Sequence, residues 1–279
     1  MDKKEFREEI KTYIDDCYDR FNSYQRIAME ILVEFDRVCC INQLDYYLAY
    51  GTLIGAIRDG NQIPWDYDID TLVKIDDRER LISVLNKDLG NDFYYDYSDK
   101  TPAYPTSCLR ICKKGYNMMA LHVDVFFLIG TPNDEHKRNI HIDKLRRVMT
   151  LRTLKNLPVY LPQNLHQSKL KSLILKVLLP NQLLKYLENR LFKKYKLVES
   201  DNWCTNQTVY KKVYPKEIFA TTTKVKVNDL PFNVPVGYEK FLTHNYGDWQ
   251  KYYPVKSRFE EFYNMLNAVE DRQRLYNRQ

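Results

Sequence analysis

The order of hydrophobic and polar positions predicts helices and strands that alternate along the first half of the chain. Apolar side chains recur at steps of three and four over residues 5–42, which predicts a helix, with a break near residues 22–23. A second helix is expected over residues 77–89, where Asp76 and Asp77 precede the apolar stripe. Apolar, β-branched and aromatic runs predict strands over residues 44–50, 69–75, 93–97, 107–112 and 119–128.

The second half of the chain has a weaker pattern. Residues 131–165 are polar and irregular, whereas residues 167–198 combine an apolar stripe at helical spacing with many lysines. Short strands and loops are expected over 205–240, and a closing helix over 256–277. Because strands and helices are intermixed, we expect an α+β fold with a mixed sheet. Neither a Gly-x-Gly-x-x-Gly turn after the first strand nor a P-loop is present, which argues against two common nucleotide-binding folds.

Composition and charge narrow the classes of protein that fit this pattern. The chain has 279 residues, of which 44% are hydrophobic, as is typical of a globular protein with a sizeable core. The net charge of +6 is too small for a dedicated nucleic-acid-binding protein, but it suits anionic substrates. The sequence has no apolar run of about 18 residues, and its N-terminal segment is charged. We therefore expect a cytoplasmic protein. The six cysteines are expected to be free thiols.

Three aspartates at alternate positions, Asp66, Asp68 and Asp70, are the first candidates for chemistry. Alternate residues of a strand point to one face, so these carboxylates can converge, and their mutual repulsion favours a divalent cation with oxygen ligands. Asp66 is expected on the loop just before the strand. The alternative is a solvated acidic turn, against which stand the large apolar neighbours Trp65 and Tyr67.

Asp124 lies inside an apolar run, where a lone carboxylate is costly unless it is paired or coordinated. If its strand lies beside the strand of Asp70, its carboxylate completes the acidic site. The alternative is a salt bridge to Arg110 or Arg58. His122 lies on the same face and either bonds a substrate or ligand carboxylate or is satisfied within the core.

The pair Gly51-Thr52 opens a short helix after the first predicted strand. A small residue at a helix N-terminus lets backbone N–H groups approach a phosphate. This pair alone is a weak signal. Followed by an acidic strand and a third aspartate on a later strand, it indicates phosphate chemistry.

This combination is typical of the nucleotidyltransferase superfamily, whose fold is polymerase-β-like, and the local sequence resembles the LicD family. The resemblance is carried by residues 47–58 (YLAYGTLIGAIR), 63–70 (IPWDYDID) and 122–126 (HVDVF). Residues 231–236 (PFNVPV) and 246–249 (YGDW) are similar to the C-terminal part of that family. The family includes bacterial phosphocholine transferases and the fukutin-related phosphoribitol transferases.

The resemblance implies a CDP-linked donor such as CDP-choline, and Mg²⁺ or Mn²⁺ as cofactor. It also implies that Asp68 and Asp70 are the metal-binding pair and that Asp124 is the third metal ligand. Asp66 is then a further acid near the metal, and Asp66 or Asp124 could accept the proton of the acceptor hydroxyl. Tyr67 stands where the family often has Asp, a departure that leaves all four acids intact.

Donor contacts are expected from Gly51, Thr52, Arg58, Trp65 and Arg110. The arginines either bind the donor phosphates or form ion pairs within the chain, in the case of Arg58 near Asp59. Trp65 or Tyr246 could stack on the cytosine or enclose a quaternary ammonium, or either could be a core or rim residue instead.

The resulting hypothesis is a metal-dependent transferase that moves phosphocholine or a similar phospho-alcohol from a CDP-linked donor. The acceptor would be a hydroxyl of a cell-surface glycan, such as a lipopolysaccharide or capsule, or of its lipid-linked precursor. Two alternatives stay open, namely a nucleotidyltransferase that moves a nucleoside monophosphate and a non-catalytic nucleotide-binding protein. No nucleic-acid partner is expected, because no aromatic and basic stripe is present.

Three regions are expected along the chain. N-terminal helices and the catalytic core occupy residues 1–130, a basic helical insertion occupies 131–205, and residues 206–279 complete the catalytic domain. The insertion could face the acceptor, or its basic segment 167–198 could lie on the inner membrane leaflet, which would make the protein peripheral at the cytoplasmic face. The alternative is an ordinary helical pair whose lysines face water.

Overall fold

The protein was analysed as a computed structural model, which describes residues 2–101, 108–156, 178–206 and 212–276. The strands are β1 (Tyr47–Leu48), β2 (Ile69–Lys74), β3 (Phe93–Asp96), β4 (Leu109–Lys113), β5 (Val123–Gly130), β6 (Asn202–Thr205), β7 (Val213–Pro215), β8 (Thr222–Val227) and β9 (Leu230–Pro235). The α-helices are α1 (Lys3–Ile41), α2 (Tyr50–Ile54), α3 (Arg78–Asp88), α4 (Glu135–Asn156), α6 (Asn181–Phe192), α7 (Tyr238–Tyr246) and α8 (Val255–Tyr276). Shorter helical turns are the π-helix η1 (Gly55–Asp59) and the 3₁₀ helices η2 (Ile75–Asp77), η4 (Leu197–Glu199) and η6 (Lys216–Phe219).

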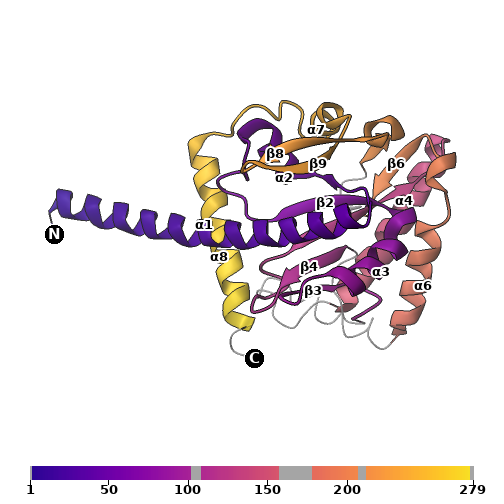
Figure 1. The fold of residues 1–279 in the computed structure, drawn as a ribbon, viewed down its shortest axis with the longest axis horizontal. Coiled ribbons are helices and arrows are strands. Elements are labelled where there is room, and N and C mark those ends of the chain that lie inside the picture. Colours follow the sequence, from indigo (N-terminus) through magenta and orange to yellow (C-terminus); the bar gives the residue numbers. More distant parts are fainter. Residues whose placement is uncertain (1, 102–107, 157–177, 207–211, 277–279) are drawn as a thin grey trace.

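A seven-stranded mixed sheet forms the centre of the fold (Figure 1). Its main path runs β1-β2-β5-β4-β3, and β6 extends it by pairing with both β5 and β7. Strands β2 and β5 are parallel, whereas the other pairs are antiparallel. The predicted mixed sheet is therefore confirmed, and a separate hairpin, β8–β9, lies above it in Figure 1.

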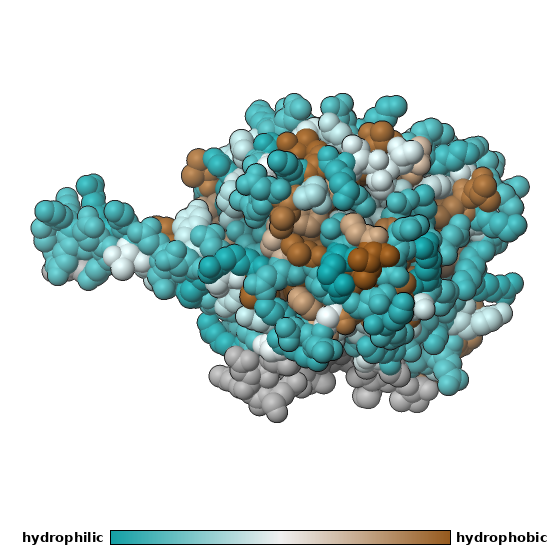
Figure 2. Space-filling view, in the orientation of Figure 1, coloured by the Kyte–Doolittle hydropathy of each residue, from teal (hydrophilic) through white to brown (hydrophobic). Residues whose placement is uncertain are grey.

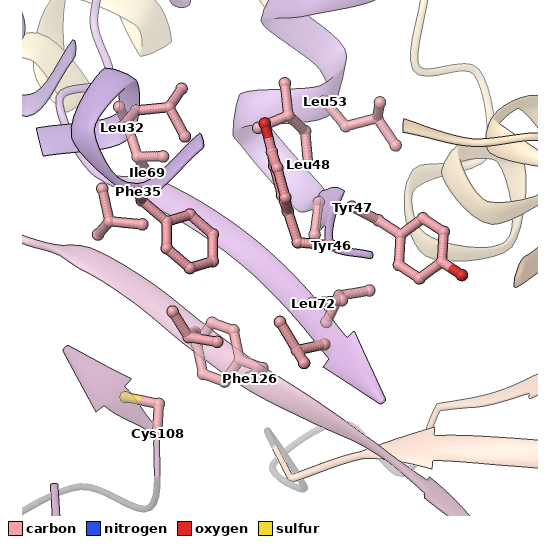
Figure 3. Close-up of a cluster of buried hydrophobic side chains, with 14 of the residues drawn as sticks. Leu32, Phe35, Tyr46, Tyr47, Leu48, Leu53, Ile69, Leu72, Cys108 and Phe126 are labelled. Carbon is pink, nitrogen blue, oxygen red and sulfur yellow. The ribbon is translucent and has the colours of Figure 1, made fainter. Parts of the chain in front are cut away.

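Helix α1 covers one face of this sheet. Its buried residues Leu32 and Phe35 lie beside Ile69 of β2 in the core (Figure 3). Successive side chains of a strand point to opposite faces, so Asp70 is directed away from α1. The core on the α1 side thus decides which face of β2 carries the acidic side chains.

The first helix is longer and more regular than the sequence pattern suggested. Helix α1 is continuous from Lys3 to Ile41, so the break expected near residues 22–23 is wrong. Ser23 fits the helix because its hydroxyl donates to the carbonyl of Arg20 at 2.6 Å, and Phe21 is fully buried. The first turns of α1 project from the body (Figure 1), and the face shown in Figure 2 is mostly hydrophilic.

Helix α4 lies where the sequence pattern indicated irregular polar structure. Its pattern is weak because most of its residues are polar, and only a few, including Ile142 and Leu145, are buried. Helix α4 packs on α6, where Arg152 forms a buried ion pair with Glu188. This long-range partner is not visible in the local sequence. Of the basic segment predicted over 167–198, residues 167–177 lie outside the described part.

Several other expectations can be compared with the structure. Strand β1 has two residues, Tyr47 and Leu48, instead of seven, because α2 begins at Tyr50. All six cysteines are free, as expected. No helix in the described ranges has the length and apolar composition needed to cross a membrane. The three-region division stays a prediction, although β6 and β7 pair onto the same sheet as the strands of the first region.

The buried imidazole of His141 in α4 predicts a pH-dependent stability. Neither ring nitrogen has a hydrogen-bond partner, and burial, together with nearby Lys194 and Lys144, lowers the pKa from 6.5 to about 4. The unfolded chain therefore binds the extra proton, so this contribution is present above pH 6.5 and is lost as the pH falls towards 4. The expected slope is at most about 1.4 kcal/mol per pH unit. Urea unfolding of His141→Phe should show a weaker loss of stability in this range, whereas the exposed control His136→Gln should match the parent chain.

Candidate active site

The three aspartates of the acidic run line one cavity with a volume of about 530 Å³. Asp66 and Asp68 come from the loop before β2, and Asp70 from β2 itself. The remaining wall comes from α2, from the chain around α7 and from α8. The three carboxylates that the sequence predicts to converge therefore do line the same cavity.

The loop that carries Asp66 is fixed from outside the cavity by α1. The N–H of Asp66 donates to the carbonyl of Ile63 at 3.0 Å, which closes a tight turn. The side-chain amide of Gln25 in α1 donates to the carbonyls of Ile63 and Asp66, at 2.9 and 2.6 Å. These bonds satisfy the turn's backbone and hold the Asp66 carboxylate towards the cavity.

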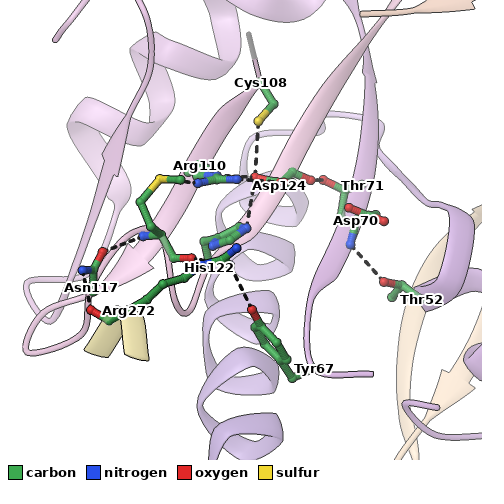
Figure 4. A network of polar contacts seen from close by, with 11 residues as sticks. Thr52, Tyr67, Asp70, Thr71, Cys108, Arg110, Asn117, His122, Asp124 and Arg272 are labelled. Atoms are coloured by element: carbon green, nitrogen blue, oxygen red, sulfur yellow. Dashed lines mark hydrogen bonds and ion pairs between the residues drawn. The ribbon is translucent and has the colours of Figure 1, made fainter. Parts of the chain in front are cut away.

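The helix start at Gly51 and Thr52 supports the other side of the acidic strand. A Cβ atom on residue 51 would lie 2.6 Å from Oδ2 of Asp66, so only glycine leaves room for this carboxylate. The hydroxyl of Thr52 accepts the backbone N–H of Asp70 at 2.9 Å (Figure 4). The preceding Tyr50 has a φ of 48°, which is a strained value for a non-glycine residue. Its partly buried ring packs on Phe126 and helps to hold this conformation. Gly51 and Thr52 thus position the aspartates directly.

The carboxylates of the cavity destabilise each other's charged form. Burial raises the pKa of Asp66 well above its ordinary value, and the neighbouring Asp68 and Asp70 add to that rise. Burial, Asp68 and Asp124 raise the pKa of Asp70 in the same way. Oδ1 of Asp66 is buried and has no hydrogen-bond partner. Such a cluster is stabilised by any cation that binds to it.

Asp124 lies next to Asp70 but is already paired. The two residues are partners in the parallel register of β2 and β5, as the acidic-site hypothesis required. Nε of Arg110 donates to Oδ1 of Asp124 at 2.7 Å, and Nε2 of His122 lies 3.4 Å from the same oxygen (Figure 4). Burial alone would raise the pKa of Asp124, but Arg110 and His122 outweigh it and hold that pKa well below its ordinary value. The ion pair is the alternative that the sequence left open.

The donor set fits a divalent cation in part. Across the described ranges, no group of three or more His, Cys, Asp or Glu side chains could hold a metal ion by itself. Mg²⁺, however, is usually bound through only one or two carboxylates together with substrate phosphates, so it does not need three protein ligands. Asp68 and Asp70, which both line the cavity, would supply these carboxylates. A role of Asp124 as third ligand stays a prediction, because Arg110 occupies its carboxylate.

The second arginine expected to bind the donor is also paired. Arg58 donates to both carboxylate oxygens of Asp59, at 2.9 and 2.8 Å, and its Cζ lies 4.2 Å from the ring centre of Tyr252. Trp65 is 9% exposed and lies within 6.0 Å of Arg58 and 5.4 Å of Arg258. Its ring therefore already contacts two guanidinium groups, which leaves little room for a cytosine or an ammonium group.

Sequence reasoning missed most of the cavity wall that the C-terminal part supplies. These additional lining residues are Lys212, Asn245, Asp248, Trp249, Lys251, Tyr253 and Glu261. Tyr246, which was considered, is confirmed as a lining residue, and burial together with Asp70 and Asp66 raises its pKa. The signal that could have identified the wall is the segment 246–249, which was noted only for its resemblance to a family.

The sequence is similar to known proteins over the segment that carries the acidic residues. The sequence model of the family described as LicD/FKTN/FKRP, nucleotidyltransferase domain, matches residues 43–164, which include all four aspartates. The chain thus contains a domain of this class. The lipopolysaccharide cholinephosphotransferase LicD of Haemophilus influenzae is 26% identical over 254 residues, covering 84% of this chain and 92% of the relative. The resemblance to the LicD family seen in the motifs is therefore confirmed for the domain over residues 43–164, and the relative extends the similarity over most of the chain.

The Arg110–Asp124 pair predicts a large effect of removing one partner. Both residues are buried, so Arg110→Met leaves an uncompensated carboxylate and should lower the free energy of unfolding by about 3 kcal/mol or more. The double variant Arg110→Met/Asp124→Leu removes both charges and should recover most of that loss. Urea unfolding at neutral pH measures both values. An unchanged stability in the single variant would show that the pair is not structural.

Proposed function

We propose that this protein is a metal-dependent transferase that moves phosphocholine, or a similar phospho-alcohol, from a CDP-linked donor to a glycan hydroxyl. The single observation that carries the proposal is the cavity in which Asp66, Asp68 and Asp70 meet. The match to a lipopolysaccharide cholinephosphotransferase over most of both chains supports the substrate class. We retain the polymerase-β-like core and the lipid-linked form of the acceptor as parts of this proposal.

The charge of the cavity supports both a cation and a choline-bearing donor. Three basic and five acidic side chains line it. An acidic excess repels a bare diphosphate, so the donor needs a divalent cation there, held by Asp68 and Asp70. The cation would supply positive charge against the donor phosphates. The same excess, with the aromatic rings of Tyr246, Trp249 and Tyr253 nearby, suits a quaternary ammonium group.

The chain's own residues would align the donor with its acceptor. Lys212 is held at the cavity by a bond from its Nζ to the carbonyl of His244 at 2.9 Å, and it can contact a phosphate oxygen. The free oxygen of Asp66 can accept the proton of the incoming hydroxyl. In-line attack then breaks the bond between the phosphorus of phosphocholine and the bridging oxygen, and cytidine monophosphate leaves.

Replacing either central aspartate should abolish transfer. With CDP-choline, Mg²⁺ and a lipopolysaccharide that lacks phosphocholine, mass spectrometry should detect a phosphocholine increment on the glycan. Asp68→Asn and Asp70→Asn should each lower the initial rate more than about 100-fold, which exceeds the loss expected for a residue that only hydrogen-bonds to a metal ligand. The exposed Asp76→Asn serves as the matched control and should retain the parent rate. A cytidylyl increment instead would identify a nucleotidyltransferase, the activity class named in the description of the matched domain.

Gly51→Ala should impair transfer without removing any polar group. The added methyl group would displace the Asp66 carboxylate, and a displacement of about 1 Å at a reacting group can cost about 100-fold in rate. Initial rates at saturating CDP-choline measure the effect, and thermal unfolding checks that the fold is retained. An unaltered rate in a folded Gly51→Ala protein would show that the position of Asp66 does not matter for the reaction.

A further inference from the structure

A second hollow, of about 720 Å³, adjoins the loop that carries Asp66. It lies between α1, the β8–β9 turn and the start of β3. Asn61 and Gln62 line this hollow, whereas Ile63 and Asp66 of the same loop line the candidate active site. The two sites therefore share one loop, and no part of the transfer reaction uses the second one. We call it the amide groove.

The lining of the amide groove has an unusual chemistry. Five carboxamide side chains contribute to it, namely Asn22, Gln25, Asn61, Gln62 and Asn228. Each carboxamide offers both donors and an acceptor, which is the combination needed for the neighbouring hydroxyl groups of a sugar. Apolar surface beside the amides comes from Met29, Phe93 and Leu230, and it suits the C–H face of a sugar ring.

The charged residues of the groove favour a neutral ligand. Lys113 forms an ion pair with Glu30. Glu34 is paired with Arg37 at 2.6 Å and accepts the N–H of Gly90 at 2.7 Å. These charges are compensated within the protein. The two remaining charged side chains of the lining, Arg26 and Asp92, have opposite signs, so the groove has no excess charge that would favour a phosphate or a metal ion.

One buried group of the groove lacks a partner. Gln62 is only 8% exposed, and its Nε2 is buried with no hydrogen-bond partner. The side-chain oxygen of Asn61 accepts the backbone N–H of Gln62 at 2.7 Å, which leaves the amide nitrogen of Asn61 for a ligand. Buried donors are normally bonded, so an unpartnered donor on a residue that lines a hollow indicates a binding site for an acceptor oxygen.

We infer that the amide groove binds a neutral saccharide unit. Saccharide binding is inferred independently of the proposed function. The assignment of this saccharide to the acceptor glycan rests on the proposed function. Gln25 connects the groove to the reaction site, because it lines the groove and its amide holds the carbonyls of Ile63 and Asp66. A sugar bound there would anchor the glycan next to the loop that presents Asp66.

Saturation-transfer NMR with methyl glycosides of neutral hexoses and N-acetylhexosamines tests this inference, without donor or metal. We expect saturation transfer to at least one glycoside and about tenfold weaker binding in Gln62→Met, which keeps the side-chain volume but removes the amide. Asn228→Gly is a second, exposed variant that preserves the backbone at φ 49°, and it should also weaken binding. Asp68→Asn, in the candidate active site, should bind the glycoside like the parent chain.

Three results would overturn the inference. The first is that no glycoside shows saturation transfer, and the second is that both groove variants bind the glycoside as the parent chain does. The third is that inorganic phosphate abolishes the saturation transfer to the glycoside. Thermal unfolding of Gln62→Met separates lost binding from lost folding, and Asn228→Gly gives the answer if Gln62→Met does not fold. A protein that binds the glycoside but transfers no phosphocholine would retain the groove and refute only the proposed reaction.

Discussion

Repulsion between carboxylates at the end of the β2–β5 pair is the constraint around which this fold is arranged. The parallel register places Asp70 beside Asp124, and the loop before β2 adds Asp66 and Asp68. Burial makes this repulsion stronger than it would be in water, because it removes the screening by solvent. A chain that folds with these acids in place must fix the backbone that carries them by hydrogen bonds, and it must compensate their negative charge.

Compensation is unequal across the cluster. Asp124 is neutralised within the protein by Arg110, and His122 lies against the same oxygen. Asp66, Asp68 and Asp70 receive no such partner among the described residues; instead, Thr52 and Gln25 hold the backbone around them. One acid is therefore satisfied by the fold, while three are satisfied only by what enters the cavity. The fold thus treats Asp124 differently from the other three acids, although all four belong to the matched domain.

The sequence predicted the local features of this site and missed the distant ones. Alternation placed Asp68 and Asp70 on one face, and the cost of burying a lone acid identified Asp124. The partners could not be decided, because the choice between Arg110 and a metal depends on the register of β4 against β5. The same limit explains why α4 was not predicted. Its apolar pattern is weak, and the ion pair of Arg152 with Glu188 of α6, which helps to hold it, is a long-range contact. The C-terminal wall, with Lys212 and Trp249, was missed because it joins the site only through tertiary packing.

The placement of arginines and lysines leads to a further consequence for the cavity. Arg58 donates hydrogen bonds to Asp59, and Arg110 donates to Asp124. Neither guanidinium group therefore has all its N–H donors available for a phosphate. Trp65 is likewise held between two guanidinium groups at one side of the cavity. The groups of the lining that remain for the proposed donor are two lysines, aromatic rings and an excess of acidic side chains. For the proposed diphosphate donor, such a lining predicts weak binding by itself and tighter binding with a cation on the acids, so donor binding and cation binding should depend on each other. The acidic cluster that opposes folding is, on this reasoning, also what makes donor binding conditional on the cation.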